Sequence, residues 1–317
     1  MRIFITGGAG FIGSHLVKNI KDNFEILSID NFNSYYNVNL KKERVDYFNI
    51  QKFTSELDLC DLSSLRKALE KFKPDLIIHL AAQAGVRFSL SNPQQYIDSN
   101  ISGFMNLLEV MKELNLDQLI YASSSSVYGA IKEMPYKESA RLLSPQSYYA
   151  LTKIHNEQTA ELFNNLYGIN SLGLRFFTVY GSFGRPDMAY YDFSKKIKSN
   201  REISVFAEGK LLRDYTYIDD ICQMIEKIIK KCYPLKGHDV LNLGNEKPRT
   251  VNELVEILEN SLEIKAKIKY ESFQKGDVEA TFSDTSKLKK LINFSPKYDL
   301  EQGIPLFVKW LNKHEKK

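Results

Sequence analysis

Tyr149 and Lys153 stand four residues apart, and a run of four serines, residues 123–126, lies upstream of them. On a helix, side chains at this spacing share one face, one turn apart. A free phenol has a pKa of about 10, and a nearby lysine charge is expected to lower that value. A serine hydroxyl can relay a proton between the phenol and a substrate. These residue types predict a site that removes a proton from a sugar or alcohol hydroxyl, provided that a hydride acceptor is bound nearby.

The start of the chain predicts the binding site of that acceptor. Residues 2–6 are expected to form a short buried strand, and a helix is expected from Phe11 to about Lys21. The loop between them fits both G-x-G-x-x-G and G-x-x-G-x-x-G spacings, through Gly7, Gly8, Gly10 and Gly13. Glycines at these places permit a tight turn and let a pyrophosphate approach the helix N-terminus. We therefore expect a dinucleotide at this loop.

An acidic residue indicates which dinucleotide. A second strand, expected over residues 24–29, ends at Asp30. This is near the distance at which a carboxylate binds the adenosine ribose hydroxyls. Asp30 would repel a 2′-phosphate and no arginine follows it directly, so the sequence favours NAD over NADP.

Composition is that of an ordinary globular protein. The chain has 317 residues, 43% of them hydrophobic and 26% charged, with a net charge of +4. That charge indicates no large basic surface, and we expect no nucleic-acid partner. The three cysteines and the scattered histidines lack metal-ligand spacing, so no metal is expected. We find no signal-peptide pattern and no run near the roughly 18 apolar residues of a membrane span, which predicts a cytoplasmic protein without a membrane partner.

Strands and helices alternate along most of the chain, which predicts an α/β fold: a Rossmann-type, doubly wound parallel sheet with a smaller α/β lid domain. Further strands are expected at residues 75–80, 118–122, 171–175 and 240–243, and helices at 63–72, 93–114, 146–167, 188–199, 218–231, 250–260 and 300–313. A long loop is expected after Arg175. We assign residues 1–175 to the NAD-binding domain and 176–317 mainly to the substrate-binding lid, with residues of about 213–245 crossing back to the sheet.

Several segments together carry a family resemblance. They are residues 6–13, the run HLAAQAGVR at 79–87, SSSSVYG at 123–129, YALTK at 149–153 and RDYTYIDD at 213–220. The chain resembles the extended short-chain dehydrogenase/reductase family, and within it the nucleotide-sugar epimerase and dehydratase branch. In finer detail, residues 79–87, 123–129 and 176–188 are similar to those of UDP-glucuronate 4-epimerases. The resemblance extends over nearly the whole chain.

The resemblance implies roles for the residues that match. Ser124, Tyr149 and Lys153 would form a Ser-Tyr-Lys triad, with Tyr149 as the base and Lys153 on the nicotinamide ribose. Together with the glycine loop, it implies that the cofactor contacts are Gly7, Gly10, Phe11, Ile12, Gly13, Asp30, Asn31, Asp58, Leu59, Leu80, Ala81, Ala82, Asn100, Ser123, Tyr149 and Lys153. Among these, Asp58 and Leu59 would contact adenine, and Asn100 would support the site from behind.

The resemblance also implies how a UDP-sugar binds. The expected substrate contacts are Arg87, Ser125, Ser126, Thr178, Arg185, Val205, Phe206, Arg213, Gln274 and Asp277. Val205 and Phe206 would cover uracil, Arg213 would pair with the diphosphate, and the last two would hold the uridine ribose. Arg87 is equally consistent with a loop salt bridge. UDP-galactose 4-epimerases commonly carry arginine at the position of Gln274, which disfavours that substrate.

Two of the serines discriminate between reactions. Related sugar 4,6-dehydratases carry Asp-Glu after the serine or threonine of the triad, and UDP-xylose-forming decarboxylases carry a glutamate just before the Val-Tyr-Gly. Ser125 and Ser126 stand at those places here and cannot act as carboxylates. An oxidised 4-keto sugar would therefore take its hydride back, on the opposite face if it has turned. The expected reaction is epimerisation.

Arg185 is the clue to the sugar itself. A guanidinium near the C5 substituent could bind a sugar carboxylate with two hydrogen bonds; alternatively, Arg185 pins only its own loop. We favour NAD-dependent interconversion of UDP-glucuronate and UDP-galacturonate, with a UDP-glucose or UDP-N-acetylglucosamine 4-epimerase, or a non-catalytic NAD-sensing or scaffold protein, as alternatives. The resemblance also implies a homodimer through helices 93–114 and 146–167. For Tyr35 and Tyr36, surface packing and contact with the cofactor edge remain equally open.

Overall fold

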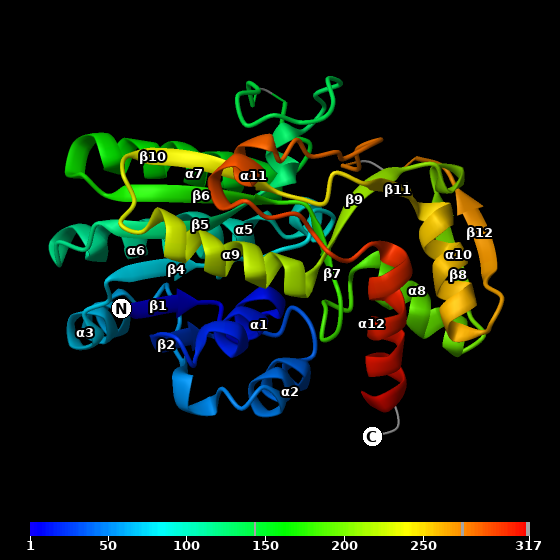
Figure 1. Ribbon diagram of the computed structural model, residues 1–317, viewed down its shortest axis with the longest axis horizontal. Coiled ribbons are helices and arrows are strands. Elements are labelled where there is room, and N and C mark those ends of the chain that lie inside the picture. The colour runs from blue at the N-terminus through cyan, green and yellow to red at the C-terminus, as the bar shows by residue number, and fades with distance from the viewer. Residues whose placement is uncertain (143, 274–275, 315–317) are drawn as a thin grey trace.

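A seven-stranded sheet, parallel throughout, forms the centre of the molecule (Figure 1). The structure, a computed structural model, describes residues 1–142, 144–273 and 276–314. The strand order is β10-β6-β5-β4-β1-β2-β3. The bounds are β1 Arg2–Thr6, β2 Glu25–Asp30, β3 Thr54–Glu56, β4 Leu76–His79, β5 Gln118–Ser124, β6 Asn170–Phe176 and β10 His238–Leu243. The chain runs outward from β1 through β2 to β3 and then returns to β4 on the other side of β1. The strand order therefore reverses between β1 and β4, and ligands bind at such switch points.

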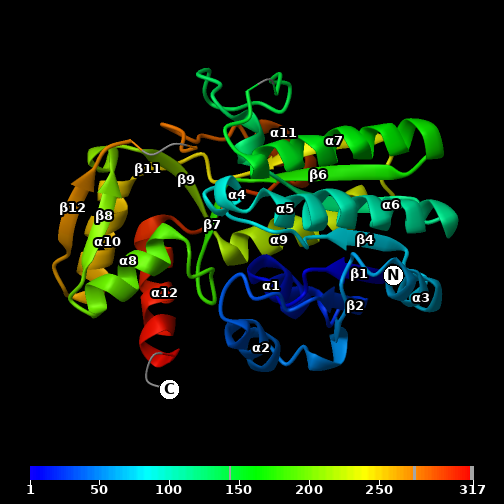
Figure 2. The ribbon, with the colours of Figure 1, turned by 180° about the vertical axis from the view of Figure 1, so that it is seen from behind.

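Helices cover both faces of this sheet. In β1, Ile3 and Ile5 pack into one apolar core and Phe4 into another, because successive side chains of a strand point to opposite faces. The first core includes the helices α1 (Phe11–Ile20), α9 (Ile218–Cys232) and α11 (Ser286–Ile292), and the second includes α3 (Leu62–Phe72), α6 (Gly103–Glu113) and α7 (Tyr148–Tyr167). Figures 1 and 2 show the two layers from opposite sides. The doubly wound α/β fold predicted from the sequence is confirmed.

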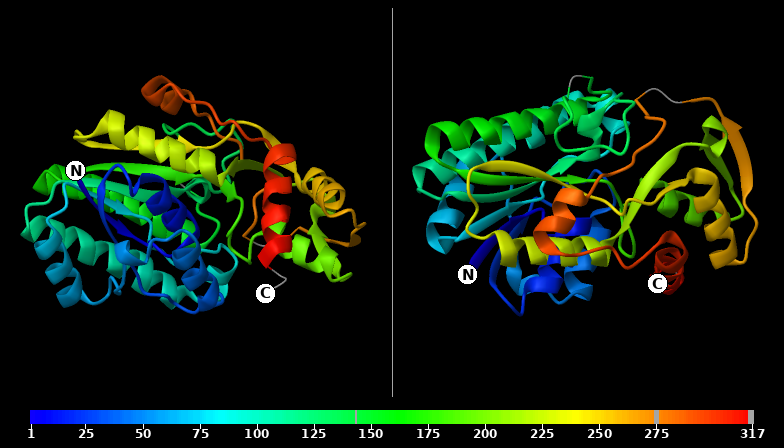
Figure 3. Two further views of the ribbon diagram at one scale, coloured as in Figure 1. Left: turned by 60° about the horizontal axis from the view of Figure 1, so that its bottom comes forward. Right: turned by 45° about the horizontal axis from the view of Figure 1, so that its top comes forward.

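A smaller group of elements lies beside the sheet (Figure 3). It contains a parallel pair and a three-stranded sheet with the order β11-β9-β7. Its elements are β7 Thr178–Tyr180, α8 Ala189–Lys198, β8 Glu202–Phe206, β9 Leu212–Tyr217, β11 Pro248–Thr250, α10 Val251–Leu262, β12 Lys267–Glu271 and α12 Leu300–His314. The prediction that a long loop begins directly after Arg175 is wrong. β6 continues to Phe176, and β7 follows and pairs with the distant β9. A three-residue strand has too short a local pattern to be recognised.

The last strand of the main sheet comes from late in the chain. β10 pairs with β6 from His238↔Ser171 to Leu243↔Phe176, and it contains the predicted strand at residues 240–243. We propose the domain division given above, with a boundary near residue 175 and a returning segment that includes α9 and β10.

The helix expected over residues 93–114 is interrupted. α5 (Pro93–Tyr96) passes into a π-helical turn at Ile97–Ser102 before α6 begins. π-turns are rare and often mark functional sites. This one holds Asn100, which is fully buried and faces the loop after β4.

α2 (Val38–Tyr47) follows β2 and was not predicted. Its sequence VNLKKERVDY has little apolar periodicity, so the pattern gave no helix signal. Lys41 and Arg44 on this helix are nevertheless buried. Buried cations need partners, so these side chains are expected to pair with anionic groups next to the helix.

Candidate active site

A cavity of ≈ 1240 Å³ opens at the carboxyl ends of the central strands. It runs from the glycine loop after β1, past the segment after β4, to Tyr149 and the loop around Arg185. Pockets for one drug-sized ligand usually measure about 300–1,000 Å³. The cavity is larger than that range, as a site for a dinucleotide together with a second ligand would be.

The glycine loop forms a close cradle at one end of this cavity. Gly7 has φ +76°, and a Cβ on it would lie 2.8 Å from the backbone N of Ala81. A Cβ on Gly13 would lie 2.0 Å from the carbonyl oxygen of Gly7. No side chain caps the N-terminus of α1 at Gly10, so its first N–H groups can face a phosphate. These features fit a dinucleotide pyrophosphate.

Asp30 ends β2 beside this cradle. Its carboxylate accepts hydrogen bonds from Ala9 N (3.1 Å) and Phe32 N (2.8 Å), and it forms an ion pair with Lys41 at 3.6 Å. Asn31 donates to Asp58 at 2.9 Å. Lys41 was not among the predicted site residues, because the weak apolar pattern of α2 did not predict a helix there. Burial lowers the pKa of Lys41, although the charge of Asp30 opposes that shift.

The structure brings together nearly all the residues expected at the cofactor. Those lining the cavity are Gly7, Gly10, Phe11, Ile12, Gly13, Asp30, Asn31, Asp58, Leu59, Leu80, Ala81, Ala82, Ser123, Tyr149 and Lys153. Asn100 lies behind this wall instead. Its Oδ1 accepts from Gln83 N at 2.7 Å and its Nδ2 donates to Thr152 Oγ1 at 3.1 Å. Asn100 thus connects the cavity wall after β4 to α7.

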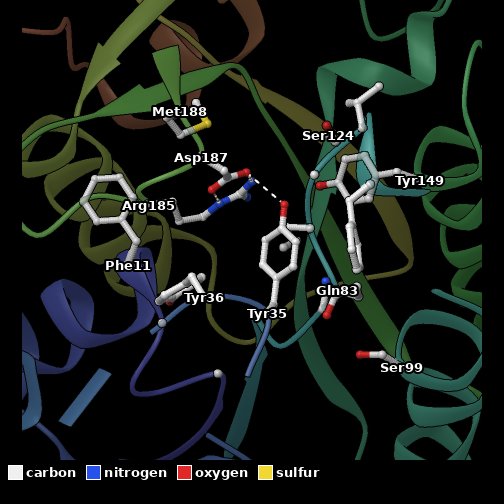
Figure 4. Close-up of a pocket in the computed structure, with 18 of the residues that line it drawn as sticks. Phe11, Tyr35, Tyr36, Gln83, Ser99, Ser124, Tyr149, Arg185, Asp187 and Met188 are labelled. Carbon is white, nitrogen blue, oxygen red and sulfur yellow. Dashed lines mark hydrogen bonds and ion pairs between the residues drawn. The ribbon is translucent and has the colours of Figure 1, made fainter. Parts of the chain in front are cut away.

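The three triad side chains meet where β5 ends against the start of α7. Ser147 caps α7 by accepting from Ala150 N at 3.1 Å, which fixes the first turn carrying Tyr149. Ser124 lies next to Tyr149 (Figure 4), and its Oγ donates to Ser126 Oγ at 3.1 Å. The ammonium of Lys153 is 6.0 Å from the centre of the Tyr149 ring and donates to Ala122 O at 2.8 Å. One helical turn therefore presents a phenol and an amine to the same cavity.

Their pKa values correct one expectation. Burial raises the pKa of Tyr149, and the neighbouring Ser124 hydroxyl and the charge of Arg185 lower it only in part. Burial also lowers the pKa of Lys153 to about 8, against the opposing charge of Glu157. The predicted lowering by Lys153 is wrong for this structure, because desolvation outweighs the nearby charges.

Arg185 and Thr178 line the cavity near Tyr149, together with Ser125 and Ser126. The guanidinium of Arg185 binds Asp187 through Nε (3.0 Å) and Nη2 (2.5 Å). Arg185 therefore pins its own loop, and it also points into the cavity (Figure 4). The loop-pinning reading is therefore observed, and the place of Arg185 on the cavity wall is compatible with the other reading, contact with a sugar carboxylate.

At the opposite end of the substrate region, Asp277 joins two arginines. It accepts from Arg213 Nη2 at 2.8 Å and from Arg87 Nη2 at 3.3 Å. The guanidinium of Arg87 lies 5.0 Å from the centre of the Phe206 ring. Arg213 and the fully buried Val205 are not among the described residues that line the cavity. Gln274 lies outside the described residues.

Tyr35 and Tyr36 also line the cavity, which the sequence left undecided. The Tyr35 hydroxyl donates to Asp187 at 3.0 Å, and the Tyr36 hydroxyl accepts from Arg44 at 2.6 Å. Their aromatic, asparagine-rich loop was the available signal, but their partners lie far along the chain or on the unpredicted α2.

A profile described as the NAD dependent epimerase/dehydratase family matches residues 3–244. The chain belongs to this family. This membership confirms the family resemblance predicted from the sequence. It also confirms the prediction that the cofactor is NAD. It also agrees with the glycine cradle and with Asp30.

Relatives of this family member match it over nearly its whole length. UDP-glucuronate 4-epimerase of Thermodesulfobacterium geofontis is 40% identical over 311 residues, which are 96% of this chain and 94% of that protein. The crystal structure of UDP-glucuronic acid 4-epimerase from Bacillus cereus, in complex with UDP-glucuronic acid and NAD, has a TM-score of 0.93 and 30% identity, covering 99% of this chain and 100% of that one.

A third member acts on another sugar. UDP-N-acetylglucosamine 4-epimerase from Methanobrevibacter ruminantium, in complex with UDP-N-acetylmuramic acid, has a TM-score of 0.88 and 31% identity, covering 99% of this chain and 98% of that one. Identities of 30% and 31% do not separate the two sugars. The choice between them rests on the residues of the site.

Among the described residues, no helix is long and apolar enough to span a bilayer. In the same part of the chain, no group of three or more His, Cys, Asp or Glu side chains could hold a metal ion.

Proposed function

We propose that the protein interconverts UDP-glucuronate and UDP-galacturonate by inverting C4 of the sugar. NAD-dependent 4-epimerisation of a UDP-sugar is the reaction of its relatives, in agreement with the prediction from the sequence. The observation that supports a uronate is Arg185, a guanidinium facing the cavity close enough to Tyr149 for its charge to act on the phenol. A neutral sugar would give this charge no matching group.

The chemistry of the chain's own residues supports transient oxidation. Bound at the glycine loop, NAD⁺ would supply the acceptor for the C4 hydride and the donor for its return. To take the proton of the 4-hydroxyl, Tyr149 must be a phenolate, so the positive charges near it, Arg185 among them, have to offset the burial that raises its pKa. The Ser124 hydroxyl is at hand to relay the proton. Lys153 is placed to donate to the nicotinamide ribose. Because Tyr149 is protonated when the keto sugar turns, it can return the proton on the other face.

The side chains beside the triad do not favour elimination. Ser125 and Ser126 line the cavity, and neither can act as a carboxylate base. The 4-keto form of a uronic acid is a β-keto acid and can lose CO₂. We propose that Arg185, with Thr178 and these serines, holds the carboxylate out of alignment with the ketone and so suppresses that loss.

The diphosphate would remain fixed while the sugar turns. Arg213 and Arg87 converge on Asp277. Guanidinium groups bind phosphate oxygens in a two-point geometry, so this cluster can exchange part of its hold on Asp277 for the diphosphate. Phe206, beside Arg87, is placed to cover the base.

Replacing Arg185 by alanine tests the assignment of the sugar. Removing a charged hydrogen-bond partner costs about 1.5–3 kcal/mol, or roughly 10- to 100-fold in binding. We expect kcat/KM for UDP-glucuronate to fall by about that factor, and CO₂ release to become detectable. Unchanged affinity for UDP-glucuronate would remove the role. Lys195→Ala, an exposed change on α8, is the control.

A substrate panel separates the proposal from its rivals. Purified protein is incubated with UDP-glucuronate, UDP-glucose and UDP-N-acetylglucosamine separately, and products are identified by NMR. We expect UDP-galacturonate from the first. Turnover of only the neutral sugars would favour the second candidate, which the UDP-N-acetylglucosamine 4-epimerase relative keeps open. No turnover of any sugar with NAD still bound would indicate a sensing or scaffold protein.

We further propose that the enzyme is a cytoplasmic homodimer. α7 exposes a row of large apolar side chains, Tyr148, Leu151, Leu162, Leu166 and Tyr167, each 46–61% accessible. A helix face of this kind packs well against a second copy of itself. Sedimentation should give twice the mass of the chain, and Leu162→Glu should shift it to the monomer. A wild-type monomer at micromolar concentration would contradict the dimer.

A further inference from the structure

Asp187 binds the guanidinium of Arg185, which is the group that the carboxylate of the proposed substrate would also bind. Its carboxylate takes two hydrogen bonds from Arg185, through the Nε and Nη2 edge of the guanidinium. The side chains of Arg185 and Asp187 are 22% and 33% accessible, and both line the cavity. A uronate carboxylate is the same chemical group as the Asp187 side chain. Asp187 and the sugar would therefore compete for one edge of Arg185.

Tyr35 gives Asp187 a second partner. Its hydroxyl donates to Asp187 Oδ2 at 3.0 Å from the loop after β2 (Figure 4). Burial, and then the charge of Asp187, raise the pKa of Tyr35 to about 12, so the phenol stays protonated and remains a donor. The ring lies 4.9 Å from that of Phe88, and a Cβ on Gly85 would be 2.3 Å from the hydroxyl. Tyr35 is therefore held in place independently of Arg185.

The other cations of the cavity already have partners, so binding of a carboxylate depends on the competition for Arg185. Besides Arg185, the described cations that line it are Lys41, Arg87, Lys153 and Lys196. Three of these pair with carboxylates, Lys41 with Asp30, Arg87 with Asp277 and Lys196 with Asp192, and Lys153 donates to Ala122 O. The Arg185–Asp187 pair carries no net charge. A uronate gains the full attraction of Arg185 only if Asp187 moves off it.

We propose that Asp187 is an internal competitor that the uronate carboxylate displaces from Arg185, and that Tyr35 retains Asp187 after the exchange. The inference rests on the proposed function, since it assigns Arg185 to the sugar carboxylate. Only a charged sugar completes the exchange, because a neutral one leaves the Arg185–Asp187 pair intact. Asp187 and Tyr35 are thus specificity-determining residues that act through Arg185.

Besides the Arg185–Asp187 pair, the loop has a second anchor, which makes the variants interpretable. Arg44, fully buried on α2, donates to Phe183 O at 2.9 Å and to Gly184 O at 3.1 Å. Neither bond involves the side chain of Asp187 or Tyr35. Asp187→Asn and Tyr35→Phe, both nearly isosteric, should leave the loop where it is.

The test is a comparison of dissociation constants by calorimetry with saturating NAD. UDP-glucuronate and UDP-glucose are titrated into Asp187→Asn and Tyr35→Phe, all in a Tyr149→Phe background that prevents turnover. We expect Asp187→Asn to bind UDP-glucuronate about 10-fold more tightly and Tyr35→Phe to bind it several-fold more weakly, with little change for UDP-glucose. The two substitutions act in opposite directions because one removes the competitor and the other removes its alternative partner.

A matched control separates the competition from net charge. Asp192→Asn removes one negative charge from the same cavity, but Asp192 pairs with Lys196 and not with Arg185. We expect it to change UDP-glucuronate binding less than about 2-fold. Weaker or unchanged uronate binding in Asp187→Asn, or equal effects on both ligands, overturns the inference. Failure of the proposed function is read separately, as absence of UDP-galacturonate from the wild-type enzyme.

Discussion

Replacing Tyr149 by phenylalanine is expected to lower kcat by about 10²- to 10⁴-fold, the usual contribution of a positioned general base. Phenylalanine keeps the ring and removes only the hydroxyl next to Ser124. NAD binding should be retained, because the glycine cradle and Asp30 are distant from this hydroxyl along the cavity. Steady-state kinetics together with NAD titration measure the two effects separately.

The adjacent tyrosine provides a control for that variant. Tyr148 precedes Tyr149 on α7 but is 46% accessible, and it does not line the cavity among the described residues. Tyr148→Phe should leave kcat within about 2-fold of the wild type. A loss of less than 10-fold in Tyr149→Phe would show that another group moves the proton.

Replacing Lys153 by methionine should have the second largest effect. The lysine is buried and donates to Ala122 O, at the end of the cavity where we propose that the nicotinamide ribose binds. Methionine has similar bulk but no donor and no charge. We expect kcat/KM to fall by at least about 10²-fold with weaker NAD binding, as is usual when a preorganised donor is lost.

A pH profile distinguishes this role from a packing role. Burial lowers the pKa of Lys153 to about 8, so the ammonium loses its proton as pH rises through that value. Wild-type kcat/KM should therefore decline above about pH 8, and Lys153→Met should lack that decline. A profile with the same alkaline limb in both proteins would contradict a role for the ammonium.

The residues that the sequence predicted best are those whose signal is local. Gly7 to Gly13 and Asp30 lie within one strand-loop-helix-strand unit, and Tyr149 and Lys153 share one helical turn. Such units carry their geometry in their spacing. Distances between these residues could be anticipated without knowing the rest of the fold.

The parts that escaped prediction depend on contacts between distant segments. Asp187 meets Tyr35 across 152 positions, and Arg213 meets Asp277 across 64. The sign of the shift at Tyr149 also required the structure, because burial decides it and no spacing reveals burial. The pairing of the Asp187 carboxylate with Arg185 could not be predicted from the sequence either, although it affects how a uronate would be recognised.

Short or polar elements were missed for a different reason. α2 is rich in charge, and β7 has three residues, so neither has the apolar repeat on which a sequence pattern depends. Both matter to the site: α2 supplies Lys41 and Arg44, and β7 supplies Thr178.

In the proposed reaction, C4 of a uronate gives up its hydride and receives the same one back. UDP-glucuronate deuterated at C4 is the sharpest test, with the product analysed by NMR and CO₂ measured in parallel. We expect UDP-galacturonate with deuterium retained at C4 and no CO₂. Hydrogen from solvent at C4, or stoichiometric release of CO₂, would contradict it.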